Sequence, residues 1–193
     1  MTRFGFRLAL LVLVLATVGC DRITKHLAVE ALADLPRQSF LADTIRLEYV
    51  ENRGAFLGLG SDWPESVRVA LFTIGNSLLL ALLMLFAIRY RWSGPLLVGA
   101  CLFAAGGVSN LADRVAHGSV VDFLNVGVGP LRTGIFNVAD MAILAGALIV
   151  AAAAMSAIDQ PSAANASDAS LRSDTETSGN SSSTRSNSVA SSL

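Results

Sequence analysis

Four long apolar runs dominate the pattern of hydrophobic and polar positions along the chain. They extend from about Phe6 to Leu27, Val67 to Tyr90, Pro95 to Ala112 and Ile135 to Ile158. Each run is long enough to cross about 30 Å of hydrocarbon as a helix. The pattern therefore predicts an all-α integral membrane protein with four transmembrane helices.

The connection between the first two runs, about residues 28–66, has a different pattern. Residues 44–50 alternate polar and apolar side chains, which predicts a half-buried β-strand. The next ten residues contain three glycines that permit tight turns, and Trp63 is placed to anchor the second helix at the membrane interface. We expect a small extramembrane β-sheet and loop between helices 1 and 2, belonging to one domain over residues 1–158.

The composition changes abruptly at the end of the fourth run. Residues 161–193 contain 12 serines and almost no large apolar side chains. Such a segment cannot bury enough apolar surface to fold, so we expect residues 159–193 to form a disordered, Ser-rich cytoplasmic tail.

The overall composition supports a membrane location. The chain is 53% hydrophobic and 15% charged, whereas soluble domains carry about 25% charged residues. The net charge of −1 gives no reason to expect binding to nucleic acid.

The distribution of arginines indicates the membrane topology less clearly than the apolar runs indicate the number of spans. Arg3 and Arg7 before the first run, and Arg89 and Arg91 after the second, favour a cytoplasmic N-terminus. The first connection also contains arginines, but long loops cross the membrane largely regardless of charge. With an even number of spans, both termini are expected in the cytoplasm.

The N-terminus permits an alternative interpretation. A basic start, an apolar stretch and Val18-Gly-Cys20 together resemble a bacterial lipoprotein signal, which would be processed at Cys20. Thr17 stands where such a signal usually carries Leu, and three more apolar runs follow. We therefore interpret this segment as the first spanning helix.

Two aspartates, Asp122 and Asp140, lie at the margins of apolar stretches. A carboxylate at membrane depth costs several kcal/mol unless it is paired or solvated, so both are candidate functional residues. Asn137 precedes Asp140 by three residues and would share its helix face. Two neighbouring carboxylates in different environments can divide the acid and base roles, one taking a proton from water and the other donating one.

Asp122 and Asp140 alone do not distinguish a peptidase from a small proton-coupled transporter with a carboxylate relay. The sequence contains no metal-ligand cluster, phosphate-binding loop or Ser/His/Asp arrangement, so we expect no metal and no cofactor.

Further polar residues lie at the ends of the first and third runs. Asp21 and Lys25 are four apart and can pair on one helix face. Asn110, Asp113 and Arg114 fall within about one helical turn, where Asp113 could pair with Arg114, and Arg114 could instead bind a backbone carbonyl or a lipid phosphate. The Ala, Gly and Ser residues before them allow close helix packing.

Five motifs in this order resemble a known family: Asp21-Arg-Ile-Thr-Lys25, Asn52-Arg-Gly-Ala-Phe56, Asn110-Leu-Ala-Asp-Arg114, Gly118-Ser-Val-Val-Asp-Phe123 and Phe136-Asn-Val-Ala-Asp140. Together they are similar to the bacterial lipoprotein signal peptidases, or signal peptidases II, which are membrane aspartic proteases. The resemblance covers about residues 5–158.

The resemblance implies an activity, a substrate and a location. The family cleaves diacylglyceryl-modified prolipoproteins just before the lipid-bearing cysteine, at the outer face of the bacterial cytoplasmic membrane. The implied partners are therefore these precursors and membrane lipids, and we expect the protein to act as a monomer.

The resemblance also implies roles for individual residues. The catalytic pair maps onto Asp122 and Asp140, and Asp21 and Lys25 become structural support. The residues expected to position substrate, lipid or the catalytic pair are Asn52, Gly54, Phe56, Asn110, Arg114 and Asn137. Phe56 would clamp the substrate beneath a loop that covers the site.

Two residues depart from the family pattern. Arg22 follows the first aspartate where the family often has Gln, and Ser109 precedes Asn110 where the family often has Gly. Serine is small enough to preserve close helix packing. The Ser-rich tail is not part of the family pattern.

Overall fold

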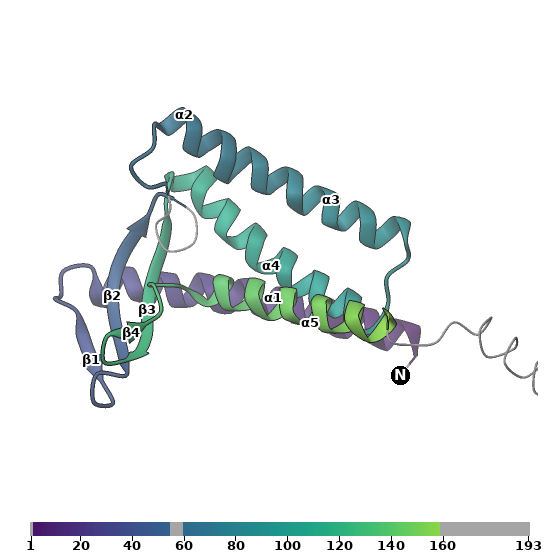
Figure 1. The fold of residues 1–193 in the computed structure, drawn as a ribbon, viewed down its shortest axis with the longest axis horizontal. Helices are drawn as coiled ribbons and strands as arrows, with labels where there is room; N and C mark the ends of the chain where they lie inside the picture. Colours follow the sequence, from purple (N-terminus) through teal and green to yellow (C-terminus); the bar gives the residue numbers. More distant parts are fainter. Residues whose placement is uncertain (1, 55–59, 159–193) are drawn as a thin grey trace, which may run out of the picture. The chain divides into compact units, whose positions relative to one another are not determined.

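The computed structural model describes residues 2–54 and 60–158. In these residues, four helical segments are long and apolar enough to span a membrane (Figure 1). They are α1 (Arg3–Leu32), the continuous series α2 (Glu65–Arg68), η2 (Val69–Gly75) and α3 (Asn76–Arg89), then α4 (Gly94–His117) and α5 (Val138–Ile158). The predicted multi-pass membrane fold is confirmed. Phe56 and the Ser-rich tail lie outside the described residues.

The helix ends differ from the predicted ones for local reasons. Helix α1 continues to Leu32, five residues past the apolar run, with Asp21, Lys25 and Ala28 as its buried residues. Helix α5 begins at Val138 rather than Ile135 because Asn137 caps it, as described below. The chain divides into two compact units, Met1–Ala153 and Ala154–Leu193, and the sheet, Asp122 and Asp140 lie in the first.

The second span contains a π-helical segment, η2, between two α-helical segments. Beyond its end, the Ser77 hydroxyl donates to the carbonyl of Thr73 at 2.7 Å, a side-chain bond that adds to the backbone ladder. π-helical turns often occur at functional sites. Here Leu71, Phe72 and Gly75 from η2 line the cleft described in the next section.

The sheet is antiparallel, with the order β1-β2-β3-β4. Its strands are β1 (Gln38–Phe40), β2 (Ile45–Asn52), β3 (Val120–Val128) and β4 (Leu131–Arg132). The predicted sheet between helices 1 and 2 therefore exists, but half of it comes from the connection between α4 and α5. Pattern analysis missed strand β3, which carries Asp122.

Helix α4 packs on α1 and α3, and its small residues allow the backbone of α5 to approach (Figure 1). A Cβ atom added to Gly106 would lie 2.3 Å from the carbonyl oxygen of Ala139. One added to Gly146 would lie 2.5 Å from the carbonyl oxygen of Gly99. These approaches require glycine, and they place the first turn of α5 directly against α4.

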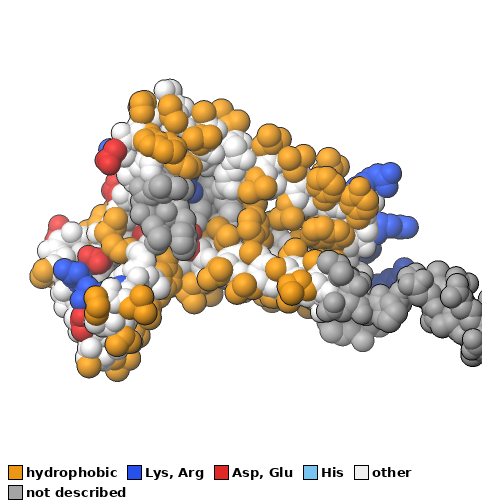
Figure 2. All heavy atoms as spheres, in the orientation of Figure 1, with side chains coloured by type: hydrophobic (Ala, Val, Ile, Leu, Met, Phe, Trp, Pro, Cys, Tyr) orange, Lys and Arg blue, Asp and Glu red, His pale blue; other side chains and the backbone are white. Residues whose placement is uncertain are grey.

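The outer faces of the helices are apolar. Figure 2 shows hydrophobic side chains over the helices, with Asp and Glu side chains gathered at the end that carries the sheet. The exposed positions on α1 include Leu8, Leu11, Val12 and Leu15. A helix surface of this kind suits contact with lipid tails. Polar side chains buried between such helices are costly, so they are candidate functional residues.

Candidate active site

Asp122 is buried on strand β3, with only 2% of its surface exposed. The strand register places Val50 opposite Asp122 and Asn52 opposite Val120, so Asn52 is a diagonal neighbour of Asp122 on the same face. The side-chain amide of Asn52 donates to Oδ2 of Asp122 at 2.9 Å, and that of Asn137 donates to Oδ1 at 2.6 Å. Both carboxylate oxygens therefore accept from neutral amides.

Asp140 occupies the first turn of α5 in a reciprocal capping arrangement with Asn137. The backbone N–H of Asp140 donates to Oδ1 of Asn137 at 2.9 Å, and the backbone N–H of Asn137 donates to Oδ2 of Asp140 at 3.2 Å. This is a capping box, with Asn at the N-cap and Asp three residues later. Because Asn137 also donates to Asp122, one fully buried side chain connects both aspartates.

Asn110 holds the other oxygen of Asp140. Its Nδ2 donates to Oδ1 of Asp140 at 2.8 Å, while its Oδ1 accepts from Nζ of Lys25 at 2.8 Å. An ammonium group can only donate, so the contact with Lys25 fixes which end of the Asn110 amide faces Asp140. Lys25 therefore orients a donor to the aspartate pair without bonding to either aspartate itself.

Lys25 belongs to a group of acidic and basic side chains between α1 and α4, which we call the supporting cluster: Asp21, Arg22, Lys25 and Asp113. All of these except Arg22 are buried. Nζ of Lys25 lies 2.7 Å from carboxylate oxygens of both Asp21 and Asp113. Asp113 also accepts from the guanidinium of Arg22. The two carboxylates are thus matched by two cations, the arrangement that makes buried charge tolerable.

The supporting cluster also fixes the start of α5. Oδ1 of Asp21 accepts from the backbone N–H of Ala139 at 2.8 Å, and Oδ2 accepts from the hydroxyl of Ser109 at 2.6 Å. The N–H of Ala139 is one of the groups at a helix N-terminus that have no partner within the helix. Asp21 therefore sets the position of the residue next to Asp140.

Arg114 connects α4 to the loop that follows β2. Its guanidinium donates to the carbonyl oxygen of Gly54 at 2.8 Å and to that of Asn110 at 3.4 Å. The backbone N–H of Gly54 in turn donates to Oδ1 of Asn52 at 2.9 Å. The alternative pairing of Asp113 with Arg114 is wrong, because Asp113 faces α1 while Arg114 reaches the loop.

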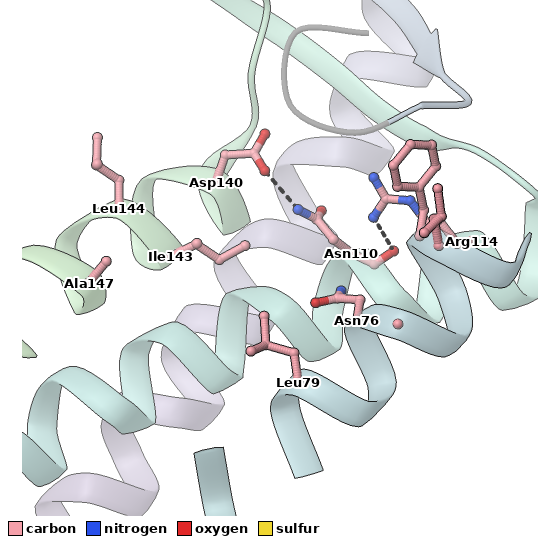
Figure 3. Close-up of a pocket in the computed structure, with 11 residues that line it drawn as sticks. Asn76, Leu79, Asn110, Arg114, Asp140, Ile143, Leu144 and Ala147 are labelled. Carbon is pink, nitrogen blue, oxygen red and sulfur yellow. Dashed lines mark hydrogen bonds between the residues drawn. The ribbon is translucent and has the colours of Figure 1, made fainter. Parts of the chain in front are cut away.

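A cleft of about 480 Å³ opens beside Asp140 (Figure 3). Ile143, Leu144 and Ala147 line it from α5, and Leu79 lines it from α3. Four residues contribute polar atoms to this mainly apolar lining: Asn76, Asn110, Arg114 and Asp140. Mostly apolar clefts with a few convergent polar groups are the usual form of small-ligand and substrate sites.

Burial changes the proton affinity of Asp122. The pKa of Asp122 is raised from 3.8 to about 6, mainly by the loss of water and also by the nearby Asp140 carboxylate. Hydrogen bonds from Asn52 and Asn137 lower this pKa and only partly offset the rise. An aspartate with this pKa exchanges its proton close to neutral pH, as an acid–base catalyst requires.

The sequence matches the family model described as Signal peptidase (SPase) II over residues 13–156. The chain belongs to the signal peptidase II family. It is 37% identical over 144 residues to the lipoprotein signal peptidase of Syntrophotalea carbinolica, an alignment covering 73% of this chain and 86% of the relative. It is 33% identical over 138 residues to that of Syntrophomonas wolfei subsp. wolfei, covering 70% of this chain and 85% of the relative.

The fold is also similar to that of a solved membrane protein. A solved structure described as a bacterial membrane enzyme superposes with a TM-score of 0.67 at 23% identity, covering 78% of this chain and 90% of the other. The protein is therefore a membrane protease of the aspartic type, as the motifs predicted.

The structure brings most of the predicted site residues together. Those in contact with the aspartate pair, or one residue removed from it, are Asn52, Gly54, Asn110, Arg114, Asn137, Asp21 and Lys25. Among the described residues, no group of three or more His, Cys, Asp or Glu side chains is placed to hold a metal ion.

Sequence analysis gave no role to the two departures from the family pattern. The guanidinium of Arg22 donates to the carbonyl oxygen of Ser109 at 3.1 Å as well as to Asp113. The hydroxyl of Ser109 gives Asp21 a donor that glycine could not supply. The two unusual residues thus contact each other, and Ser109 also contacts Asp21 of the supporting cluster. The sequence did not indicate this contact, because the two residues lie 87 positions apart.

Proposed function

We propose that the protein removes signal peptides from diacylglyceryl-modified prolipoproteins by hydrolysing the peptide bond just before the lipidated cysteine, with Asp122 and Asp140 as its catalytic pair. The observation that carries this proposal is the shared Asn137, which donates to Asp122 at 2.6 Å and forms a capping box with Asp140 at the wall of the cleft. Among the described residues, the two carboxylates have only neutral groups as direct hydrogen-bond donors.

The chemistry requires one aspartate ionised and the other protonated. The ionised carboxylate takes a proton from water as the water oxygen attacks the scissile carbonyl carbon, and the protonated carboxyl donates to the developing oxyanion. Collapse of the tetrahedral intermediate breaks the C–N bond, and a carboxyl proton passes to the leaving amine. Asn52, Asn110 and Asn137 hold both carboxylates in position throughout these steps.

The cleft provides a place for the substrate. Its apolar wall from α3 and α5 would let acyl chains remain in a hydrocarbon-like environment while the peptide reaches Asp140. Arg114 and Asn110 lie between that wall and the loop at Gly54, where they would orient the substrate backbone. The proposed clamp, Phe56, lies outside the described residues and remains a prediction.

The same proposal gives the protein a location and a domain organisation. Both termini would be cytoplasmic, with the aspartate pair near the outer face of the bacterial inner membrane and residues 1–158 acting as a monomeric peptidase domain. A reporter enzyme fused after residue 158 should be active only on the cytoplasmic side. Reporter activity on the outer side would reverse the orientation.

Cleavage of a defined precursor tests the proposed function. The purified protein is incubated with a prolipoprotein carrying a diacylglyceryl-modified cysteine, and the product masses locate the broken bond. We expect cleavage just before that cysteine and little cleavage of the same precursor without the lipid. Cleavage at another bond, or an intact precursor combined with proton-driven flux in proteoliposomes, would contradict the proposal.

A further inference from the structure

A second hollow, which we call the basic pocket, lies next to the cleft and has a volume of about 220 Å³. Arg53, Arg68, Arg114 and His117 line it, and Glu65 is the one carboxylate in the lining. Three guanidinium groups thus surround a space that contains a single opposing charge. Such an excess of positive charge around a small hollow favours an anionic ligand.

Two of the three guanidinium groups are held in place by backbone carbonyl oxygens. Arg68 donates to the carbonyl oxygen of Ser61 at 3.0 Å, and Arg114 donates to that of Gly54 at 2.8 Å. Within residues 2–54 and 60–158, none of the three arginines in the pocket forms an ion pair. In the same residues, the buried Nε of Arg114 has no acceptor. A guanidinium group that is held in place and has no carboxylate partner can bind phosphate oxygens with its remaining N–H donors.

The position of the pocket along the helices indicates where such a phosphate comes from. Glu65 is the first residue of α2 and His117 is the last residue of α4, so the pocket lies where two spans end (Figure 1). Lipid headgroup phosphates lie at this level of a bilayer, so a basic pocket at the span ends is within reach of an anionic headgroup. Trp63, a residue typical of the interface, stacks on Phe72 in the pocket wall with ring centroids 6.1 Å apart.

The basic pocket and the cleft share Arg114 and Phe72 in their walls. A phospholipid whose phosphate lies in the pocket would therefore be a direct neighbour of the substrate cleft. We propose that the basic pocket binds the headgroup phosphate of an anionic phospholipid. This site is separate from the peptide chemistry, because neither aspartate of the pair lines it.

The experiment measures lipid binding directly, without substrate. The full-length protein is titrated with phosphatidylglycerol, with diacylglycerol bearing the same acyl chains, and with inorganic phosphate, and bound molecules are counted by native mass spectrometry. We expect phosphatidylglycerol to bind and diacylglycerol not to bind. Equal binding of diacylglycerol, or binding of inorganic phosphate alone, would overturn the proposal.

Three variants and a control locate the site. Arg53→Gln and Arg68→Gln should each weaken phosphatidylglycerol binding about tenfold, the effect of one charge-assisted hydrogen bond. Arg68→Lys keeps the charge and should lose less. Arg37→Gln removes an exposed charge from the same connection outside the pocket and should bind as the wild type does. If all three variants bound phosphatidylglycerol as the wild type does, the assignment would be overturned.

One further outcome would assign the pocket to the substrate instead. Two precursors are compared, one with Asp and one with Asn after the lipidated cysteine. If Arg53→Gln changed the cleavage rate of the Asp precursor only, while phosphatidylglycerol binding stayed constant, the pocket would recognise an acidic peptide. The lipid proposal would then be wrong. A failure of the peptidase proposal would leave the lipid titration unaffected, so the two proposals can fail separately.

Discussion

Two sets of carboxylates lie side by side in this protein, and they differ in the partners that surround them. In the supporting cluster, Asp21 and Asp113 share the ammonium of Lys25 at 2.7 Å, and Asp113 also binds Arg22. In the aspartate pair, Asp122 and Asp140 accept hydrogen bonds from asparagine side chains and one backbone N–H, without a cation in direct contact among the described residues.

This difference explains how one residue type serves two purposes. The ion pairs of the supporting cluster hold its carboxylates in fixed positions, so the cluster fixes geometry. A buried carboxylate with only neutral donors keeps a high affinity for protons, and the pKa of Asp122 is raised to about 6 mainly by burial. Asn110 joins the two sets, because it accepts from Lys25 and donates to Asp140.

The largest expected effect comes from the aspartate pair itself. Asp122→Asn and Asp140→Asn should each reduce cleavage of a lipidated precursor at least about 1000-fold, because each removes a proton-transfer group. The measurement is the initial rate of cleavage at equal amounts of membrane-inserted protein. Cleavage by either variant at close to the wild-type rate would remove that residue from the catalytic pair.

Breaking the charge balance of the supporting cluster should act mainly on stability. Asp113→Asn leaves Lys25 and Arg22 with one carboxylate fewer, which should lower the free energy of unfolding by about 3 kcal/mol. Denaturant unfolding in detergent measures this loss. The exposed Asp34→Asn is the matched control and should leave stability within about 0.5 kcal/mol of wild type. Equal effects of the two substitutions would contradict the structural role of Asp113.

The raised pKa of Asp122 makes a pH-dependent contribution to stability. Between about pH 4 and pH 6 the folded protein holds a proton on Asp122 that the unfolded chain has lost, so this contribution is greatest below pH 4 and declines as the pH rises through 6. The total change is about 3 kcal/mol. Unfolding free energies of wild type and Asp122→Asn should therefore diverge over this range, with the wild type losing more. Parallel pH profiles would show that burial does not raise this pKa.

The smallest effect is expected at Arg22. Arg22→Gln removes a partner from Asp113, but Lys25 still neutralises that carboxylate, so the loss should be about 1 kcal/mol. Because 40% of the Arg22 side chain is exposed, raising the salt concentration should shrink the difference from wild type. A loss as large as that of Asp113→Asn would mean that Arg22, rather than Lys25, is the main counter-ion.

The sequence was sufficient for the four spans because a long apolar segment in a bilayer must satisfy its backbone internally, and a helix does so. It was not sufficient for strand β3. The residues Val120–Val128 pair with β2, far earlier in the chain, and their apolar and polar side chains alone do not indicate that partner. Without β3, the contact between Asn52 and Asp122 could not be derived from the pattern.

In the site, too, contacts within a few residues were predicted and contacts between distant segments were not. The proximity of Asn137 to Asp140 was predicted from their spacing of three residues, which is local information. Their reciprocal capping bonds were not predicted, because the helix was expected to begin at Ile135. The predicted ion pair between Asp113 and its neighbour Arg114 was wrong. Asp113 pairs instead with Lys25 and Arg22 on α1, and Lys25 lies 88 positions away in the sequence. Contacts between helices depend on how the helices pack, which the local pattern does not determine.

Infrared spectroscopy of carboxyl groups tests most directly whether Asp122 has the raised pKa. The protonated carboxyl band is recorded from about pH 4 to pH 8 in the wild type, in Asp122→Asn and in Asp113→Asn. We expect a band that titrates near pH 6 in the wild type, disappears in Asp122→Asn and persists in Asp113→Asn. A titrating band that survives in Asp122→Asn and disappears in Asp113→Asn would contradict the account.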